Sequence, residues 1–202
     1  MAIFNGFHGM MPPQDKVAQV AAVPYDVVNS EEAAELAKGN PLSFLRVSRP
    51  EIEMEPGIDL HSDPVYAKAV ANFKRLIAEA PLTEDPVANL YVYSLKMNGR
   101  TQIGIAGAAS VEDYNTNVIK KHEKTRKDKE DDRARHVMEL RSHTGPVFLT
   151  YRDNKDVDAI VAEITAETPY YSFVAPDGIE HKLWKAGAER TEKLSKIFKD
   201  EV

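Results

Sequence analysis

The charged run that spans residues 119–133 holds the residue types that could do chemistry. It reads Ile-Lys-Lys-His-Glu-Lys-Thr-Arg-Lys-Asp-Lys-Glu-Asp-Asp-Arg and has apolar strand patterns on both sides. Histidine can exchange a proton near neutral pH, carboxylates can hold a cation, and lysine and arginine bind phosphate oxygens. Phosphoryl transfer needs mainly positioning and positive charge, so this combination predicts a site for a phosphate-bearing ligand. A solvated helix face is the alternative interpretation of such a charge run.

Residue type assigns roles within this run. His122 and Glu123 are the candidate catalytic residues, with His122 as the acid or base. The residues of the run that could hold a phosphate or another ligand group are Lys121, Thr125, Asp132 and Arg133. Glu123 and Asp132 could also bind Mg²⁺, because carboxylate oxygens are ligands that this ion prefers.

Helical spacing predicts how part of the run is arranged. Lys129 and Arg133 fall one turn apart and place two cations on one face, with Asp128 and Asp132 as two acids beside them. Like charges at this spacing repel each other unless a ligand or a counter-charge pairs with them. Thr125 followed by Asp128 fits a helix start whose free N–H groups could point at an anion. Thr125 could equally act only as a helix cap.

Several classes of enzyme are excluded by motif spacing. The stretch His122-Glu123-Lys124-Thr125-Arg126 begins like a zinc-protease motif, but Arg126 stands where the second histidine ligand is required. The sequence contains no phosphate-binding Gly-x-x-x-x-Gly-Lys-Ser/Thr loop and no Gly-x-Ser-x-Gly elbow. It contains no cysteine, which excludes a Cys-ligated metal, disulfides and thiolate nucleophiles.

Two further segments could contribute ligand-binding side chains. Asp26 follows an apolar stretch and could face a ligand, although the Pro-Tyr-Asp sequence is also ordinary turn chemistry. Arg46 and Arg49 could hold a carboxylate or phosphate, although arginines at strand ends are common. His181 alternates with apolar residues, which favours a packed structural role. The histidines without recognisable ligand spacing are His8, His61, His136 and His143.

Composition limits the cellular context and the partners. The chain has 202 residues, 43% of them apolar, which is enough for a substantial core. Its net charge is −6, and basic residues are interleaved with acids, so nucleic acid is not an expected partner. Neither a secretory leader nor an apolar stretch long enough to cross a membrane is recognisable, and cysteine is absent. The expected location is therefore the cytoplasm.

Sequence patterns predict strands, two hairpins and several amphipathic helices. The first hairpin turns at Asn98-Gly99, and the second turns within residues 176–178. The expected strands span residues 20–23, 42–47, 90–95, 102–107, 147–151, 170–175 and 179–184. The expected helices begin near Ser30, at Asp63-Pro64, near Thr125, at Asn154 or Asp156, and before Thr191. Residues 49–62 are expected to form a loop.

This order of elements predicts an α+β fold with a mixed, largely antiparallel sheet and packed amphipathic helices. A single domain over residues 1–202 is expected. The terminal helix carries the apolar side chains Leu194, Ile197 and Phe198. If these are exposed, they could promote a homodimer.

Several separate motifs give the chain a family resemblance. They are Pro24-Tyr25-Asp26-Val27-Val28, Tyr91-Val92-Tyr93, Ile119-Lys120-Lys121-His122-Glu123-Lys124-Thr125, Asp132-Arg133, Gly145-Pro146-Val147-Phe148 and His181-Lys182-Leu183-Trp184. In this order they closely resemble the domain-of-unknown-function 1015 family, from near the N-terminus to about Trp184. The resemblance itself implies no established biochemical activity.

The resemblance also implies a longer architecture. Family members are about twice as long and continue into a strand that ends in Ala-Asp-Gly-His-His-Arg, which this chain lacks. That pattern is similar to the phosphate-binding motif of ParB and sulfiredoxin-like proteins, a group with nucleotide hydrolases and free-serine kinases. The chain is thus expected to be the N-terminal half of the family architecture, with the C-terminal half as a missing partner. It would contribute His122, Glu123, Thr125, Asp132 and Arg133 to a shared site.

Two hypotheses of function follow. The first is a cytosolic nucleotide- and phosphate-binding protein that uses Mg²⁺ in phosphotransfer on a small metabolite, for example a hydroxy amino acid. Its partner would be a small phosphorylated molecule, and its class a small-molecule kinase or phosphotransferase. The alternative is a non-catalytic binding or assembly module whose charged helix docks a partner.

Overall fold

The structure is a computed structural model that describes residues 2–121 and 125–202. Its contacts divide the chain into two compact units, each built from segments far apart in the sequence. The sheet unit contains residues 2–14, 83–121 and 148–202, and the helical unit contains residues 15–82 and 125–147. The prediction of a single domain over residues 1–202 stays a prediction.

The sheet unit is built on four antiparallel strands in the order β5-β4-β8-β7. These strands are β4 (Tyr91–Met97), β5 (Arg100–Ala106), β7 (Tyr171–Val174) and β8 (Glu180–Lys185). Asn98 and Gly99 connect β4 to β5 with φ angles of 51° and 77°. Two positive φ values suit the tight turns that match strand twist, and the Asn-Gly pair adopts them readily. Both predicted hairpins are therefore confirmed.

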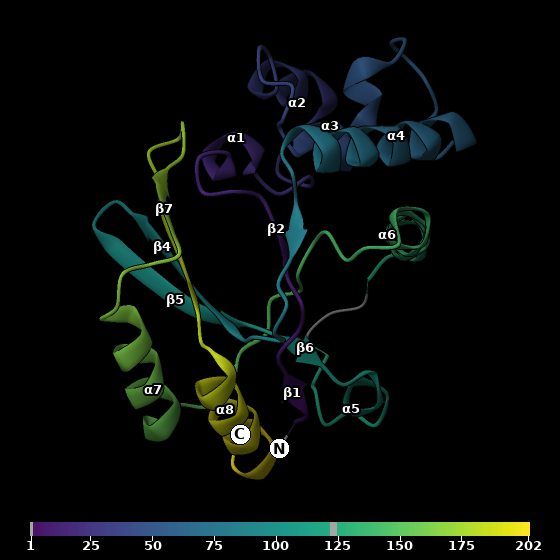
Figure 1. The fold of residues 1–202 in the computed structure, drawn as a ribbon. Coiled ribbons are helices and arrows are strands. Elements are labelled where there is room, and N and C mark those ends of the chain that lie inside the picture. The colour runs from purple at the N-terminus through teal and green to yellow at the C-terminus, as the bar shows by residue number, and fades with distance from the viewer. Residues whose placement is uncertain (1, 122–124) are drawn as a thin grey trace. The chain divides into compact units, whose positions relative to one another are not determined.

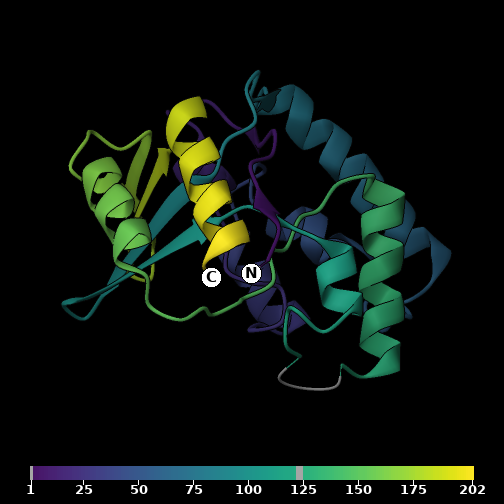
Figure 2. The same ribbon diagram turned by 90° about the horizontal axis from the view of Figure 1, so that it is seen from below.

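The core of the sheet unit lies between one face of the sheet and two helices, α7 (Lys155–Thr165) and α8 (Ala188–Asp200). Figures 1 and 2 show both helices on the same side of the strands. Val92 and Trp184 are paired across β4 and β8, and they pack with Ile164 and Leu194. Helix α7 begins after Asn154, as predicted, because its side chain accepts hydrogen bonds from the first-turn N–H groups.

Short elements complete the sheet unit. Strand β1 (Phe4–Asn5) pairs with β6 (Ala108–Ala109), β2 (Met10–Met11) pairs with β3 (Thr83–Glu84), and α5 spans Val111–Asn115. The buried Asp85 carboxylate accepts hydrogen bonds from Tyr91 (3.1 Å) and Asn89 (3.2 Å) and pairs with Lys185 (2.9 Å). These bonds fix the segment that follows β3 to strands β4 and β8.

The helical unit packs short helices around one long amphipathic helix. Its elements are α1 (Val17–Val20), α2 (Ser30–Leu36), α3 (Leu45–Ser48), the 3₁₀ helix η1 (Pro50–Glu53), α4 (Asp63–Glu79) and α6 (Lys127–Leu140). Phe73 and Leu76 of α4 are buried with Val47 of α3 and Leu140 of α6. Apolar burial therefore holds α6 against helices that lie much earlier in the sequence.

A cluster of four charged side chains also holds the helical unit together. Glu53 forms ion pairs with Arg46 (2.5 Å), Lys68 (2.8 Å) and Arg75 (3.5 Å). Burial alone would raise the pKa of Glu53, but the hydrogen bonds from Lys68 and Arg46 lower it to about 2. Glu53 is therefore ionised at neutral pH and neutralises cations from α3 and α4.

The predicted α+β class is confirmed, and every strand pair in the described part of the chain is antiparallel. The helices predicted from amphipathic spacing at Asp63, Asn154 and before Thr191 are present as α4, α7 and α8. Leu194 and Phe198 of α8 are buried in the core, and Ile197 is partly buried. The homodimer stays a prediction.

Two predicted strands form other structures. Residues 20–23 contain the end of α1 followed by an irregular segment, and residues 42–47 lead into α3. Short apolar runs do not distinguish a buried strand from a buried helix. In α3 a helix is favoured because it places Leu45 in one apolar cluster and Val47 in another.

The predicted strand over residues 147–151 and the predicted loop over residues 49–62 also differ from the structure. Residues 147–151 form no strand, and the side chains of Val147 and Phe148 are 80% and 74% exposed. Within the described ranges no neighbouring strand pairs with this segment, so its strand propensity alone does not form a sheet. The loop contains η1, which Pro50 starts because its fixed φ suits a first helical position.

Helices α2 and α4 start at Ser30 and Asp63, as expected, and in each the residue before the start occupies the N-cap. Asn29, rather than Ser30, caps α2 and forms a reciprocal capping box with Glu32. Ser62, rather than Asp63, occupies the N-cap of α4. In both cases the sequence contains adjacent residues that cap well, and spacing alone does not select between them.

We expect Glu53→Gln to destabilise the helical unit by about 3 to 5 kcal/mol at pH 7, because three cations would lose their buried counter-charge. The stabilisation from Glu53 is complete above its ordinary pKa of 4.5 and declines as the pH falls toward about 2. Urea unfolding followed by circular dichroism between pH 3 and pH 7 measures both effects. The exposed Glu79 is the control, since Glu79→Gln should change the free energy of unfolding by less than about 0.5 kcal/mol. Identical pH dependence in wild type and Glu53→Gln would contradict this account.

Candidate functional site

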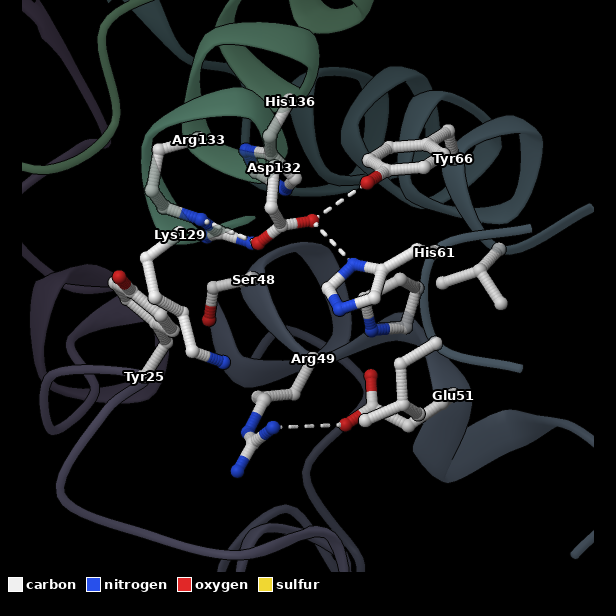
Figure 3. Close-up of a pocket in the computed structure, with 13 residues that line it drawn as sticks. Tyr25, Ser48, Arg49, Glu51, His61, Tyr66, Lys129, Asp132, Arg133 and His136 are labelled. Atoms are coloured by element: carbon white, nitrogen blue, oxygen red, sulfur yellow. Dashed lines mark hydrogen bonds and ion pairs between the residues drawn. The ribbon is translucent and has the colours of Figure 1, made fainter. Parts of the chain in front are cut away.

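A small pocket within the helical unit gathers polar side chains from several of its elements. Its volume is about 80 Å³, and it is lined by residues of α3, η1, α4 and α6 and of the loop before α4 (Figure 3). A water molecule needs roughly 10 to 15 Å³ measured in this way, whereas pockets for drug-sized ligands are roughly 300 to 1,000 Å³. The pocket therefore suits a group of the size of a phosphate or carboxylate.

Asp132 of α6 is the most highly connected side chain of the pocket. Its Oδ1 accepts a hydrogen bond from the Tyr66 hydroxyl (2.5 Å) and lies 3.1 Å from His61 Nδ1. Its Oδ2 accepts two hydrogen bonds from Arg133, at 2.9 Å from Nε and 2.5 Å from Nη2. The Asp132 side chain is only 10% exposed, so these partners replace most of its hydration.

The protonation states of Asp132 and Tyr66 follow from this arrangement. Burial alone would raise the pKa of Asp132, but the hydrogen bonds from Tyr66 and Arg133 lower it below its ordinary value. Burial and the adjacent Asp132 raise the pKa of Tyr66 to about 12. At neutral pH the pocket therefore contains an ionised carboxylate and a protonated tyrosine that donates to it.

His61 and His136 both line the pocket, but in different ways. The His61 side chain is 50% exposed, and Figure 3 shows its second ring nitrogen turned toward the pocket. Because Asp132 is ionised, His61 Nδ1 carries the proton of their hydrogen bond, which leaves Nε2 facing the pocket. His136 is buried and donates its Nε2–H to the carbonyl of Val47 (3.1 Å). Burial lowers the pKa of His136, so it is neutral at pH 7.

Three cationic side chains and two carboxylates line the pocket, which leaves an excess of one positive charge. Arg133 is engaged by Asp132, and its guanidinium lies 4.1 Å from the centre of the Tyr25 ring. Arg49 pairs with Glu51 (3.2 Å), while its buried Nε has no hydrogen-bond partner among residues 2–121 and 125–202. Lys129 has no ion pair in the same ranges, and Figure 3 shows its amino group turned into the pocket. Lys129 is therefore the cationic donor that remains for a ligand, while Arg49 contributes positive charge to the lining.

The structure brings together two of the predicted site residues, Asp132 and Arg133, and it places Lys129 beside them as the helical spacing predicted. His122 and Glu123 lie outside the described residues, so their predicted catalytic roles stay predictions. Thr125 is exposed and does not line the pocket. The N-cap of α6 is Arg126, which makes no side-chain capping bond, so the capping interpretation of Thr125 is wrong.

The other predicted ligand residues lie outside the pocket. Lys121 belongs to the sheet unit, where its amino group lies 4.2 Å from the centre of the Tyr114 ring. Asp26 is exposed, although its neighbour Tyr25 lines the pocket. Arg46 donates to the carbonyls of Ala37 (2.7 Å) and Asn40 (2.9 Å) as well as pairing with Glu53. These bonds join the end of α2 to α3, which is a structural role.

Several pocket residues were not predicted from the sequence. His61 and Tyr66 lie 71 and 66 positions before Asp132, and no sequence spacing links them to it. His136 follows Arg133 and Asp132 at helical spacing on α6, which is a signal that could have indicated a shared face. Arg49 was a candidate because of its charge, whereas no sequence pattern indicated Ser48.

The pocket does not by itself define a metal site. No group of three or more His, Asp or Glu side chains that could hold a metal occurs within residues 2–121 and 125–202. Both oxygens of Asp132 already accept hydrogen bonds from protein groups. Binding of Mg²⁺ by Glu123 and Asp132 therefore stays a prediction.

Fold and site together define an α+β protein with a small, positively charged pocket in a helical unit. The chain belongs to the family described as Protein of unknown function (DUF1015), whose model matches residues 4–202. No curated protein and no solved structure gives a significant match. None of the helices described here is both long enough and apolar enough to cross a membrane.

We expect Asp132→Asn to lower the free energy of unfolding by about 3 kcal/mol, because Arg133 would lose a desolvated counter-charge. Asp128 lies one turn earlier on α6, and its side chain is 50% exposed. Asp128→Asn should therefore leave the free energy of unfolding nearly unchanged. Urea unfolding at pH 7 measures both values, and equal effects of the two substitutions would show that the Asp132 network does not stabilise the unit.

Proposed function

We propose that this chain is a cytoplasmic protein that binds the phosphate group of a small metabolite in the pocket of the helical unit. The observation that carries this proposal is the amino group of Lys129, which has no ion pair within residues 2–121 and 125–202 and is turned into a pocket of phosphate size (Figure 3). Charged donors bind phosphate oxygens more strongly than neutral donors do.

The charge balance of the pocket favours an anion over a cation. Its carboxylates, Glu51 and Asp132, are already paired with Arg49 and Arg133. An added cation would compete with these arginines, whereas an added anion would meet Lys129, which forms no ion pair with the residues that the structure describes. The hydroxyl of Ser48 adds a neutral donor that can form a hydrogen bond to a bound anion.

The reaction that we propose is phosphotransfer, in which the group bound in the pocket gives up or receives a phosphoryl group. The pocket has room for a phosphoryl group and not for a nucleotide, so a nucleoside and its base would lie outside it. Such a reaction depends mainly on positioning and on positive charge at the transferring oxygens. A nucleotide with Mg²⁺ as the donor, a hydroxy amino acid as the acceptor, and roles for His122 and Glu123 are further parts of this proposal.

We expect Lys129→Ala to weaken the binding of inorganic phosphate or pyrophosphate at least tenfold, since one charge-assisted hydrogen bond contributes about 1.5 to 3 kcal/mol. Lys127 is the matched control because it lies on the same helix, does not line the pocket and pairs with Asp131 at 2.8 Å. Lys127→Ala should leave binding unchanged within about twofold. Isothermal titration calorimetry at fixed ionic strength measures the dissociation constants.

Parallel titrations with ATP, with and without Mg²⁺, test the nucleotide part of the proposal. Binding of phosphate and ATP that depends on Lys129 supports a phosphate pocket used by a nucleotide. Binding of neither ligand by the wild type would contradict the proposed function. Equal binding by the wild type and Lys129→Ala would place the phosphate site elsewhere on the chain.

A further inference from the structure

We propose that His61, positioned by Asp132, exchanges a proton with the hydroxyl group of an alcohol substrate at this pocket. The inference rests on the proposed function, because it deepens the chemistry of the same phosphate site. It assigns the acid–base role to a residue of the loop before α4, and it defines the substrate class as alcohols. Asp132 is a positioning residue in this scheme, since it acts through the imidazole ring.

The His61 ring is held in a fixed orientation by Asp132. His61 Nδ1 lies 3.1 Å from Asp132 Oδ1, and the same oxygen accepts the Tyr66 hydroxyl at 2.5 Å. Arg133 holds the other carboxylate oxygen. The carboxylate is therefore fixed from two sides, and it fixes both the ring and its tautomer. A carboxylate that binds one imidazole nitrogen leaves the other as a proton acceptor and stabilises the imidazolium that forms.

A purely structural role explains the arrangement less well. An exposed ion pair contributes little to stability, and the His61 side chain is half exposed. Asp132, by contrast, is 10% exposed and receives donors from α4 and α6. His136 shows the structural alternative within the same pocket, since it is buried and its Nε2–H is bound by the Val47 carbonyl. His61 differs because its free nitrogen faces the cavity (Figure 3).

The phosphoryl donor in the proposed step is a nucleoside triphosphate, whose terminal phosphoanhydride bond breaks. His61 Nε2 takes the proton as the O–H bond of the alcohol breaks, and the hydroxyl oxygen forms a bond to phosphorus. The bond between phosphorus and the bridging oxygen of the donor breaks, and the leaving diphosphate keeps the electron pair. Lys129 and Arg49 stabilise the negative charge on the transferring oxygens. The products are a phosphate monoester, the diphosphate and a proton that His61 later releases to water.

Nitrogen NMR of the histidine rings tests the geometry without knowledge of the natural substrate. In the wild type the His61 ring should be protonated at Nδ1, and Asp132→Asn should remove this tautomer preference. Inorganic phosphate should shift the Nε2 signal of His61, while the signals of the exposed His143 stay unchanged. If phosphate binds and the His61 signals do not move, the inference fails and the proposed function stands. If phosphate does not bind, both fail.

Turnover provides the second readout. Phosphorus NMR follows transfer from ATP with Mg²⁺ to water, glycerol and L-serine as probe alcohols. We expect His61→Gln to lower kcat at least about 100-fold, the usual contribution of an acid–base group, with phosphate affinity changed by less than about twofold. His143→Gln is the matched control and should leave kcat unchanged. Turnover that survives His61→Gln, or no transfer by the wild type to any of these acceptors, would overturn the proposal.

Discussion

The docking of α6 onto α4 is the constraint on which the pocket depends. The two helices lie far apart in the sequence, and apolar burial of Leu140 with Leu76 holds one end of the contact. Nearer the start of α6, Asp132 accepts the Tyr66 hydroxyl, and the Arg135 guanidinium lies 4.0 Å from the centre of the same ring. One tyrosine thus contacts α6 through its hydroxyl and through its face. Because this contact fixes the register of α6, it also places Lys129 and Arg133 at the pocket.

The elements with long periodic patterns could be predicted from the sequence, whereas the conformation of the short apolar runs could not. Helices α4, α7 and α8 each bury a stripe at helical spacing, and the Asn98-Gly99 turn specifies its hairpin through local backbone preference. The run at residues 42–47 contains no local pattern that decides between helix and strand. Its conformation depends on which apolar clusters surround it. The run at residues 147–151 has strand propensity but no strand beside it in the described structure.

Some residues of the candidate site could likewise be predicted from the sequence, and others could not. Asp132 and Arg133 could be predicted because a dense charge run marks them, and helical spacing places Lys129 on the same face. His61 and Tyr66 could not be predicted, since only the packing of α4 against α6 brings them to Asp132. A histidine in a loop has no periodicity that could indicate its partner. Sequence patterns therefore located the charged half of the pocket, and tertiary contacts supplied the other half.

Two shielded carboxylates of the helical unit show how a structural charge differs from one that can serve a reaction. Glu53 forms ion pairs with three cations, and it does not line the pocket that contains Asp132. Asp132 meets only one cation, and its remaining partners are a neutral tyrosine and a half-exposed histidine. A charge held in this way can stabilise a proton that arrives on its neighbour, whereas the partners of Glu53 in the described structure are three cations and the amide of Asn72, none of which takes up a proton near neutral pH. The Glu53 and Asp132 side chains are similarly shielded from solvent, and both stay ionised at neutral pH. The two carboxylates therefore differ in the residues that bind them.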